Sequence, residues 1–177
     1  MAKIIDEMPG LYRVIQFDEF RKTTGVVFDM IPVHMFGPVG AVDRVLHAPN
    51  ASSPGPVGNA ARPWYMHEYQ DDNLVVLSGE RSVEIYTPGH GRVEQFTVTP
   101  ESVSKNGELI VAGGAMLVWP RYVFHRVVSG SEGSASINLA KHYDGFSIES
   151  NFNVFDVDVN TGAHKLIREG YKDQHNV

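Results

Sequence analysis

The 177-residue sequence contains no cysteine, and this absence limits its chemistry. Disulfide bonds, thiolate zinc sites and thiol nucleophiles are excluded together. Any metal that the protein binds must therefore use nitrogen or oxygen ligands. The chain also lacks a nucleophile elbow, a phosphate-binding glycine loop, a dinucleotide fingerprint and a helical HExxH sequence, so those enzyme classes are set aside.

Long apolar runs are missing as well. The longest, residues 109–119, is interrupted by Gly113 and Gly114 and is too short to span a bilayer. Near the N-terminus, acidic residues and Pro9 stand where a secretory signal would need an uninterrupted apolar stretch. We therefore expect a soluble, cytoplasmic protein.

Positive charge is scarce. The chain has 15 basic against 21 acidic residues, a net charge of -6 at pH 7, and its basic residues are scattered rather than gathered into a stripe. Nucleic acids and anionic membranes are therefore not expected as partners.

Short runs rich in valine, isoleucine, phenylalanine and tyrosine dominate the sequence from Tyr65 onward, separated by turn residues, and helical periodicity is scarce. The runs predicted as strands are residues 74–77, 82–86, 93–98, 108–111, 116–119, 123–128 and 136–140. Strands so closely spaced, with no helix between them, indicate an all-β fold built as a closed barrel or a sandwich.

The flanking segments are less regular. Residues 15–22 are predicted as a short helical turn, and residues 26–35 as a strand interrupted by Pro32. Residues 49–58 are rich in proline and glycine, which predicts a long loop that either lies over the barrel mouth or is a loose surface connection. Alternating apolar and acidic residues over 153–167 predict a further hairpin.

Residues 65–79 resemble the first motif of the cupin family, HxHxxxxE followed by six residues and a glycine. His67 matches the second histidine of this motif. Asp72 stands at the glutamate and Gly79 at the glycine, whereas Tyr65 replaces the first histidine.

Residues 114–125 resemble the second cupin motif, a glycine, five residues and PxGxxH. Gly114, Pro120 and His125 match, Tyr122 replaces the internal glycine, and Ser129 occupies the closing asparagine position. Two motifs in the right order are more specific than either alone. The resemblance implies the cupin-type double-stranded β-helix, or jelly roll, of the RmlC-like proteins.

On this resemblance we expect one cupin domain over residues 1–177, with N-terminal strands and a loop in 1–59, the core in about 60–142, and a C-terminal hairpin and tail in 143–177. Many cupins are dimers, joined by strand exchange or by packing of barrel faces. The resemblance therefore also implies a homodimer, to which the N-terminal segment could supply an arm.

Strand geometry independently predicts that the motif residues lie close together. Residues two apart on a strand share a face, so Tyr65 and His67 project together, and His125 projects from another strand. If both faces point inward, two imidazoles meet in an apolar cavity, where Asp72, expected at the turn into the next strand, adds a carboxylate. Two histidines and one carboxylate form a known site for non-haem iron(II) and related divalent ions.

His67, Asp72 and His125 are therefore predicted to bind a divalent metal ion, namely iron, manganese, nickel or zinc. The alternative is that both histidines are hydrogen-bonded core residues and that Asp72 only shapes a turn. Tyr65 is predicted as the catalytic residue, since its phenol can donate a hydrogen bond to a substrate or to a metal-bound water. Its alternative role is to fill the volume of the missing histidine.

Other polar residues are assigned roles outside the site. Glu68 and Gln70 are expected to face away from His67 by strand parity, unless a bulge reverses this. The remaining histidines lack a partner at ligand spacing and are expected to be exposed or structural: His34, His47, His90, His142, His164 and His175.

Three functions stay open. The first is a metal-dependent enzyme acting on a small organic substrate as a dioxygenase, isomerase or lyase. The second is a metal-free isomerase or epimerase, similar to the sugar-nucleotide cupins, in which His67 or His125 abstracts a proton and Tyr65 returns one. No basic cluster for a diphosphate is evident. The third is a non-catalytic module that captures a small ligand.

Overall fold

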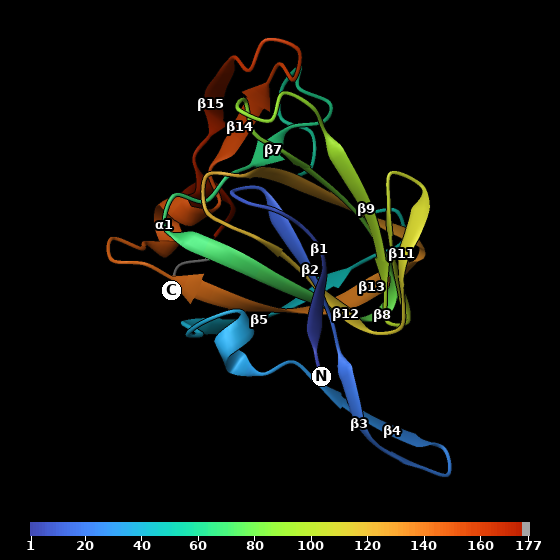
Figure 1. The fold of residues 1–177 in the computed structure, drawn as a ribbon. Coiled ribbons are helices and arrows are strands. Elements are labelled where there is room, and N and C mark those ends of the chain that lie inside the picture. Colours follow the sequence, from blue (N-terminus) through green and yellow to red (C-terminus); the bar gives the residue numbers. More distant parts are fainter. Residues whose placement is uncertain (175–177) are drawn as a thin grey trace.

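A computed structural model describes residues 1–174 and consists mainly of strands (Figure 1). His175 lies outside the described residues. The elements in chain order are β1 (Lys3–Met8), β2 (Tyr12–Gln16), β3 (Asp18–Thr23), β4 (Val26–Met30), η1 (Val33–Met35), β5 (Ala41–His47), β6 (Ser52–Ser53), β7 (Trp64–Tyr65), β8 (Gln70–Tyr86), β9 (Glu94–Thr99), β10 (Ser102–Lys105), β11 (Glu108–Ala112), β12 (Ala115–Trp119), β13 (Phe124–His142), α1 (Ile148–Asn151), β14 (Val154–Val157), β15 (His164–Arg168) and η2 (Gly170–Asp173).

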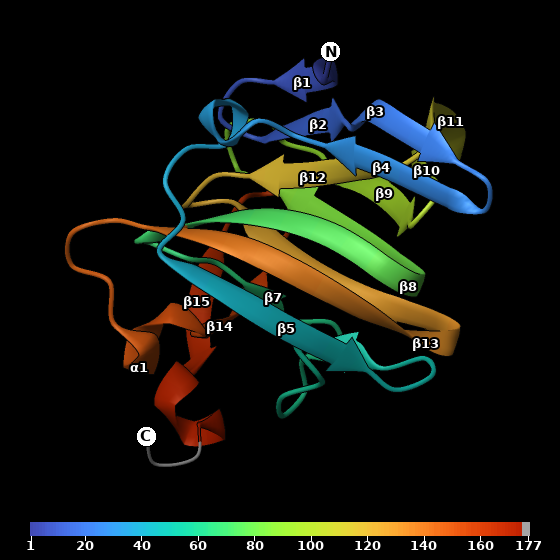
Figure 2. The same ribbon diagram turned by 90° about the horizontal axis from the view of Figure 1, so that it is seen from below.

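Two long strands, β8 and β13, form the centre of a jelly roll and run side by side in both views (Figures 1 and 2). They pair antiparallel, with Phe124 opposite Tyr86 at one end and His142 opposite Gln70 at the other. β12 and β9 pair with successive parts of β8, while β5 and β6 pair with β13. The predicted all-β jelly roll is confirmed.

Each long strand joins two of the predicted strands. Residues 74–77 and 82–86 both lie in β8, because Gly79 bends this strand without ending it. The φ angle of Gly79 is 70°, and a Cβ atom at this position would lie 2.0 Å from the carbonyl oxygen of Gly133. Only glycine tolerates both the left-handed backbone and this close approach.

The apolar core lies on the inner face of the sheet. Buried positions alternate along β9, so Phe96 and Val98 face inward. They belong to the same buried cluster as Val83 and Ile85 of β8. Fully burying one such side chain contributes roughly 1.5–3 kcal/mol to folding. This cluster stabilises β8, which carries several of the cavity residues described below.

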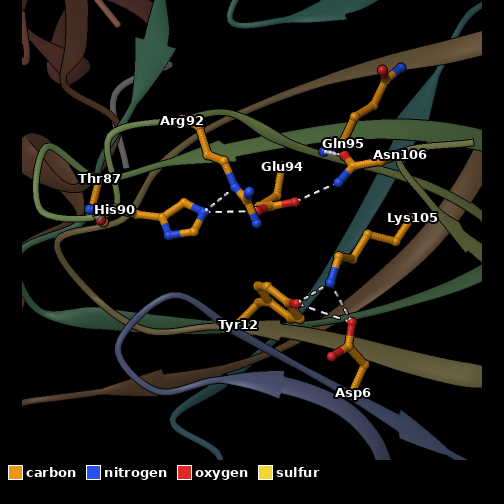
Figure 3. Close-up of polar contacts among 9 residues, drawn as sticks. All are labelled: Asp6, Tyr12, Thr87, His90, Arg92, Glu94, Gln95, Lys105 and Asn106. Atoms are coloured by element: carbon orange, nitrogen blue, oxygen red, sulfur yellow. Dashed lines mark hydrogen bonds and ion pairs between the residues drawn. The ribbon is translucent and has the colours of Figure 1, made fainter. Parts of the chain in front are cut away.

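A polar network joins the N-terminal strands to the barrel (Figure 3). The Lys105 ammonium donates to the Asp6 carboxylate at 2.7 Å and to the Tyr12 hydroxyl, and the Tyr12 hydroxyl donates to Asp6 at 3.0 Å. The Tyr12 ring packs edge-on against Phe96, with ring centroids 4.9 Å apart. β1 and β2 are therefore an integral part of the barrel.

A second network in Figure 3 surrounds Glu94, whose side chain is fully buried. Its carboxylate accepts hydrogen bonds from Arg92 at 2.7 Å and from Asn106 at 2.6 Å, and the His90 ring lies 2.7 Å away. This buried carboxylate is fully satisfied by protein groups, as buried charges usually are. The structural role expected for His90 is confirmed.

The helical turn predicted over residues 15–22 is wrong. This segment is divided between the end of β2 and β3, because β2 pairs with both β1 and β12 and buries Tyr12, Val14 and Ile15. Such tertiary pairing overrides a weak local pattern. The strand predicted over 26–35 ends at Met30, and a 3₁₀ helix follows Pro32, which has no N–H to donate to a sheet.

The proline-rich loop is held against the barrel. Ser52 and Ser53 pair with Val128 and Val127 of β13, and Ser53 lines the central cavity. The alternative of a loose surface connection is therefore wrong for residues 52–53, and a position over the barrel mouth stays a prediction.

The predicted C-terminal hairpin is confirmed as β14 and β15, which β7 joins to β13 in the main sheet. α1 precedes this hairpin and lies at the same end of the barrel (Figure 2). Within residues 1–174, no helix has the length and apolar character needed to cross a membrane.

The hairpin of β3 and β4 projects from the barrel in Figure 1. All five residues of β4 are exposed, and Val26, Val27, Phe28 and Met30 are among them. This hairpin belongs to the N-terminal segment expected to supply a dimer arm. The homodimer stays a prediction, because the structure holds a single chain.

The bend in β8 predicts a large difference between two glycine variants. Gly79→Ala should lower the free energy of unfolding by about 3 kcal/mol or more, because the new Cβ meets the Gly133 carbonyl and the backbone is left-handed. Gly89→Ala is the matched control, since a Cβ there meets nothing within 4 Å, and it should change stability by about 0.5 kcal/mol at most. Urea unfolding followed by circular dichroism measures both; equal midpoints would contradict the role given to Gly79.

Candidate active site

A cavity of about 120 Å³ lies among β5, β8, β12 and β13. Part of its wall is apolar and is formed by Leu74, Trp119 and Val127. The rest carries a concentration of polar and ionisable side chains, and the residues of both cupin-like motifs project into it.

His67 follows β7 and precedes β8, and only 3% of its surface is exposed. Its backbone carbonyl accepts a hydrogen bond from the N–H of Tyr122 at 2.7 Å. Its ring Nδ1 donates to the backbone carbonyl of Asn151, which belongs to α1. These contacts fix the imidazole plane and leave Nε2 pointing toward Asp72.

Asp72 is the third residue of β8, not a turn residue as expected from the sequence. Its Oδ1 accepts hydrogen bonds from Gln70 Nε2 at 2.7 Å and from Asn138 Nδ2 at 2.6 Å. Its Oδ2 is buried, lies 3.2 Å from His67 Nε2, and accepts no hydrogen bond of good geometry from the described residues. One carboxylate oxygen is therefore fixed and the other is available.

His125 lies near the start of β13 and is 5% exposed. Its Nδ1 donates to the backbone carbonyl of Val123 at 3.1 Å, and its Nε2 lies 3.8 Å from Asp72 Oδ2. The rings of His125 and His67 have their centroids 4.7 Å apart.

The structure thus brings together the three residues predicted as metal ligands. One ligand atom from each of His67, Asp72 and His125 lies within 4.8 Å of the others. Both histidines use Nδ1–H toward a backbone carbonyl, so both Nε2 atoms present a lone pair to a carboxylate oxygen. Three acceptors that face one another need a cation between them, either a proton or a metal ion.

Proton equilibria in the cluster follow from burial and from its charges. Burial opposes the charge on Asp72, but the facing His67 outweighs it and lowers the pKa of Asp72 to about 2. Burial also opposes charge on His67, and Asp72 outweighs it and raises the pKa of His67. Burial, together with the nearby His67, lowers the pKa of His125 to about 4. With a proton as the cation, His67 and Asp72 form an ion pair and His125 is neutral.

Tyr65 also lines the cavity, directly opposite His125 in the pairing of β7 with β13. The two ring centroids are 6.0 Å apart, and Phe152 packs edge-on against Tyr65 at 5.8 Å. Burial raises the pKa of Tyr65, so its phenol is protonated at neutral pH and can donate. The position suits the predicted catalytic role, which stays a prediction.

Gln70 was expected to face away from His67, and this expectation is wrong. Gln70 lines the cavity and orients Asp72, while its own Oε1 accepts a hydrogen bond from Asn151 Nδ2 at 3.0 Å. The reason is that β8 begins at Gln70, so strand parity does not extend back to His67. Within β8 the parity holds, and Gln70 and Asp72 share a face.

Further polar residues of the cavity were not found from the sequence, among them His47, Arg81 and Asn138. Asn138 lies two residues after Ser136 on the inner face of β13, so period-two parity along this strand is the signal that could have found it. His47 is part of the cavity wall, which is more specific than the exposed or structural role expected for it. Burial, reinforced by Arg81, lowers the pKa of His47 to about 4.

The roles expected for the remaining described histidines are confirmed. His34 and His164 are exposed. His142 stacks on Phe146 with ring centroids 3.5 Å apart and lies 3.2 Å from Gln70 Oε1, a structural contact beside the site.

Tyr122 has a φ of 67°, a left-handed conformation at the position where the second cupin motif has glycine. Its N–H donates to the carbonyl of His67. This position is therefore left-handed where it contacts His67, and the chain places an exposed tyrosine there at some cost in strain.

No protein-family model matches this sequence, and no curated protein matches it. Solved structures do match. QdtA, a sugar 3,4-ketoisomerase from Thermoanaerobacterium thermosaccharolyticum solved with TDP, is 13% identical with a TM-score of 0.55, covering 77% of this chain and 85% of that one. NovW, a 4-keto-6-deoxy sugar epimerase from Streptomyces spheroides, is 12% identical with a TM-score of 0.60, covering 82% and 71%.

The dTDP-4-dehydrorhamnose 3,5-epimerase of Elizabethkingia anophelis is 12% identical with a TM-score of 0.59, covering 80% of this chain and 75% of that one. With the jelly roll and both motif positions in place, the chain has the cupin fold. Within that fold, its arrangement is that of the RmlC-like proteins, as predicted from the sequence. At identities of 12–13%, these matches show the fold alone.

The low pKa of His125 predicts a loss of stability in mild acid. The unfolded chain takes up a proton at this histidine below about pH 6.5, whereas the folded protein does so only near pH 4. In protein stripped with a chelator, stability should therefore fall as pH drops from 6.5 to 4, with about 3 kcal/mol coming from His125. The slope should be shallower in His125→Asn and unchanged in the exposed His164→Asn. Denaturant unfolding across this pH range measures it, and identical slopes in all three proteins would refute the assignment.

Proposed function

We propose that this protein is an isomerase or epimerase that acts on a small carbonyl compound in the central cavity. The observation that carries the proposal is that a neutral imidazole, His125, and a protonated phenol, Tyr65, line one small cavity. Such a pair supplies the base and the acid that proton transfer next to a carbonyl requires. The solved structures with this fold support the same reaction class, since they include both ketoisomerases and epimerases.

The two histidines differ in what they can do. Both ring nitrogens of His67 are engaged, Nδ1 by the Asn151 carbonyl and Nε2 by Asp72, so His67 orients and stabilises the cluster. His125 has its Nδ1 fixed by Val123, and its more distant Nε2 can take a proton from the carbon beside the substrate carbonyl. Tyr65 would then return a proton to the substrate.

A second candidate keeps the same substrate class and adds a divalent metal ion. The specific observation in its favour is the buried Asp72 Oδ2, which has no good hydrogen bond and faces two Nε2 lone pairs. Nitrogen and oxygen donors of this kind fit iron, manganese, nickel or zinc, and the backbone carbonyls on both Nδ1 atoms are the usual outer support. A bound ion would supply Lewis-acid polarisation of a substrate oxygen.

Metal content separates the two candidates. In the metal-dependent case, protein purified without a polyhistidine tag should contain near-stoichiometric metal, which His67→Ala and His125→Ala lose and the exposed His34→Ala keeps. Elemental analysis measures this directly. If metal-free protein still folds and reacts, only the metal-free proton-transfer mechanism remains. If both cavity variants retain the metal, the ion binds outside this cluster.

Proton exchange with solvent tests the reaction class. With keto sugars and sugar nucleotides as a panel in D₂O, the wild-type protein should introduce deuterium beside the carbonyl, as seen by NMR. His125→Asn should slow this exchange by about 10²-fold or more, since a general base is lost. Tyr65→Phe should keep the exchange and slow product formation.

Two outcomes of the exchange experiment would contradict the proposal. Exchange that persists in His125→Asn would contradict the role of His125. A protein that binds panel members without any exchange would point to the third function, a non-catalytic small-ligand module.

A further inference from the structure

Arg81 is a buried cation of the cavity that has no carboxylate partner. Its surface is 3% exposed, and within residues 1–174 no carboxylate oxygen lies within ion-pair distance of its guanidinium group. Arg81 Nε donates a hydrogen bond to Ser134 Oγ, and Arg81 Nη2 donates one to the Val45 carbonyl, both at 3.0 Å. These contacts fix the guanidinium plane. Among residues 1–174, Nη1 has no hydrogen-bond partner. A buried charge without a counter-charge is costly, so it indicates a function.

The same cavity collects most of the unsatisfied polar atoms in the described chain. Five buried side-chain atoms in residues 1–174 lack a hydrogen-bond partner. Four of them line this cavity: His47 Nδ1, Asp72 Oδ2, Trp119 Nε1 and Ser136 Oγ. Trp119 and Ser136 can both donate, so the cavity offers donors to a ligand that brings acceptor oxygens.

The backbone places Ser136 close to Arg81. Ser136 pairs directly with Val45, whose carbonyl holds the guanidinium, and the next inward residue of β5, His47, pairs with Ser134, whose hydroxyl holds Nε. Arg81, Ser136 and His47 therefore form one corner of the cavity, separate from the cluster of His67, Asp72 and His125.

Charge and size decide which ligand fits this corner. Arg81 supplies one positive charge, because its pKa, lowered by burial to about 10, still keeps it protonated at neutral pH, and His47 is neutral. Asp43 and Asp72 are the acidic residues of the wall, so the site can match a single negative charge better than a dianion. The cavity volume of about 120 Å³ is well below the usual range of roughly 300–1,000 Å³ for larger ligands, so a small acid suits it better than a larger ligand does.

We propose that Arg81, Ser136 and His47 form a subsite for a carboxylate of the substrate, so that the substrate is a small keto or hydroxy acid rather than a nucleotide-linked sugar. The inference rests on the proposed function only in taking this cavity as the substrate site. The guanidinium presents paired N–H groups to the two carboxylate oxygens, the geometry that arginine recognises best. The substrate carbonyl is then directed toward His125 and Tyr65.

A binding experiment tests the subsite without requiring turnover. The protein has two tryptophans, so two indole N–H signals report in a proton NMR titration, and only Trp119 lines the cavity. The probes are pyruvate, its neutral isostere pyruvamide, and inorganic phosphate, added to the full chain after dialysis against a chelator. Pyruvate should shift the Trp119 signal and leave that of Trp64 in place, while pyruvamide and phosphate bind at least tenfold more weakly.

Three variants complete the test. Arg81→Met should weaken pyruvate binding at least tenfold. Its melting temperature should fall by no more than the loss of two hydrogen bonds explains, because the variant also removes an uncompensated buried charge. Arg81→Lys keeps the positive charge, so it can be tested even if Arg81→Met does not fold. It should bind pyruvate more weakly than the wild type and more tightly than Arg81→Met. The control is Arg44→Met, which removes an exposed arginine of β5 and should bind as the wild type does.

Several results would overturn the subsite. These are equal binding of pyruvate and pyruvamide, tighter binding of phosphate than of pyruvate, or an equal loss in Arg44→Met and Arg81→Met. Exchange on a neutral keto sugar without carboxylate binding would refute the subsite and leave the proposed function intact. Arg81-dependent pyruvate binding without proton exchange on any probe would support the subsite and refute the proposed function.

Discussion

The antiparallel pairing of β8 with β13 is the constraint on which the structure depends. β8 carries Asp72 and Arg81, and β13 carries His125, Ser136 and Asn138, so this one pairing brings most of the cavity's polar groups together. Because side chains alternate along a strand, a slip of one residue would turn these groups out of the cavity. The bend at Gly79 lets both ends of β8 face the same interior.

The cavity contains two buried groups of opposite charge, Asp72 and Arg81, that do not form an ion pair with each other. Asp72 is matched by His67 at one place, and Arg81 is held only by neutral oxygens at another. A core built only for stability would place these two charges in contact or replace them by apolar groups. Elsewhere the barrel follows the ordinary rule, since the buried Glu94 receives donors from every side. This contrast distinguishes the cavity from the rest of the barrel and supports the proposed carboxylate subsite.

The sequence predicted the fold well because strand periodicity and two spaced motifs carry local information. The motif residues His67, Asp72 and His125 do meet, with Asp72 on β8, His125 on β13 and His67 in the segment between β7 and β8. Gln70 was assigned to the wrong face because the start of β8 is set by pairing with β13 rather than by local residues. His47 and Arg81 were missed because they belong to no motif and reach the cavity only through long-range pairing. The end of β2 was missed for the same reason, because its partner β12 lies about a hundred residues away, whereas β3 pairs with the adjacent β4.

The carbonyl that holds His67 in place belongs to Asn151, and Phe152, the next residue, packs edge-on against both Tyr65 and His67. The motif histidine is thus positioned by a segment 84 residues further along the chain. During synthesis the strands from β1 to β13 emerge from the ribosome before this segment does. A nascent chain can therefore pair these strands while the His67 ring still lacks the carbonyl and the aromatic ring that hold it in place.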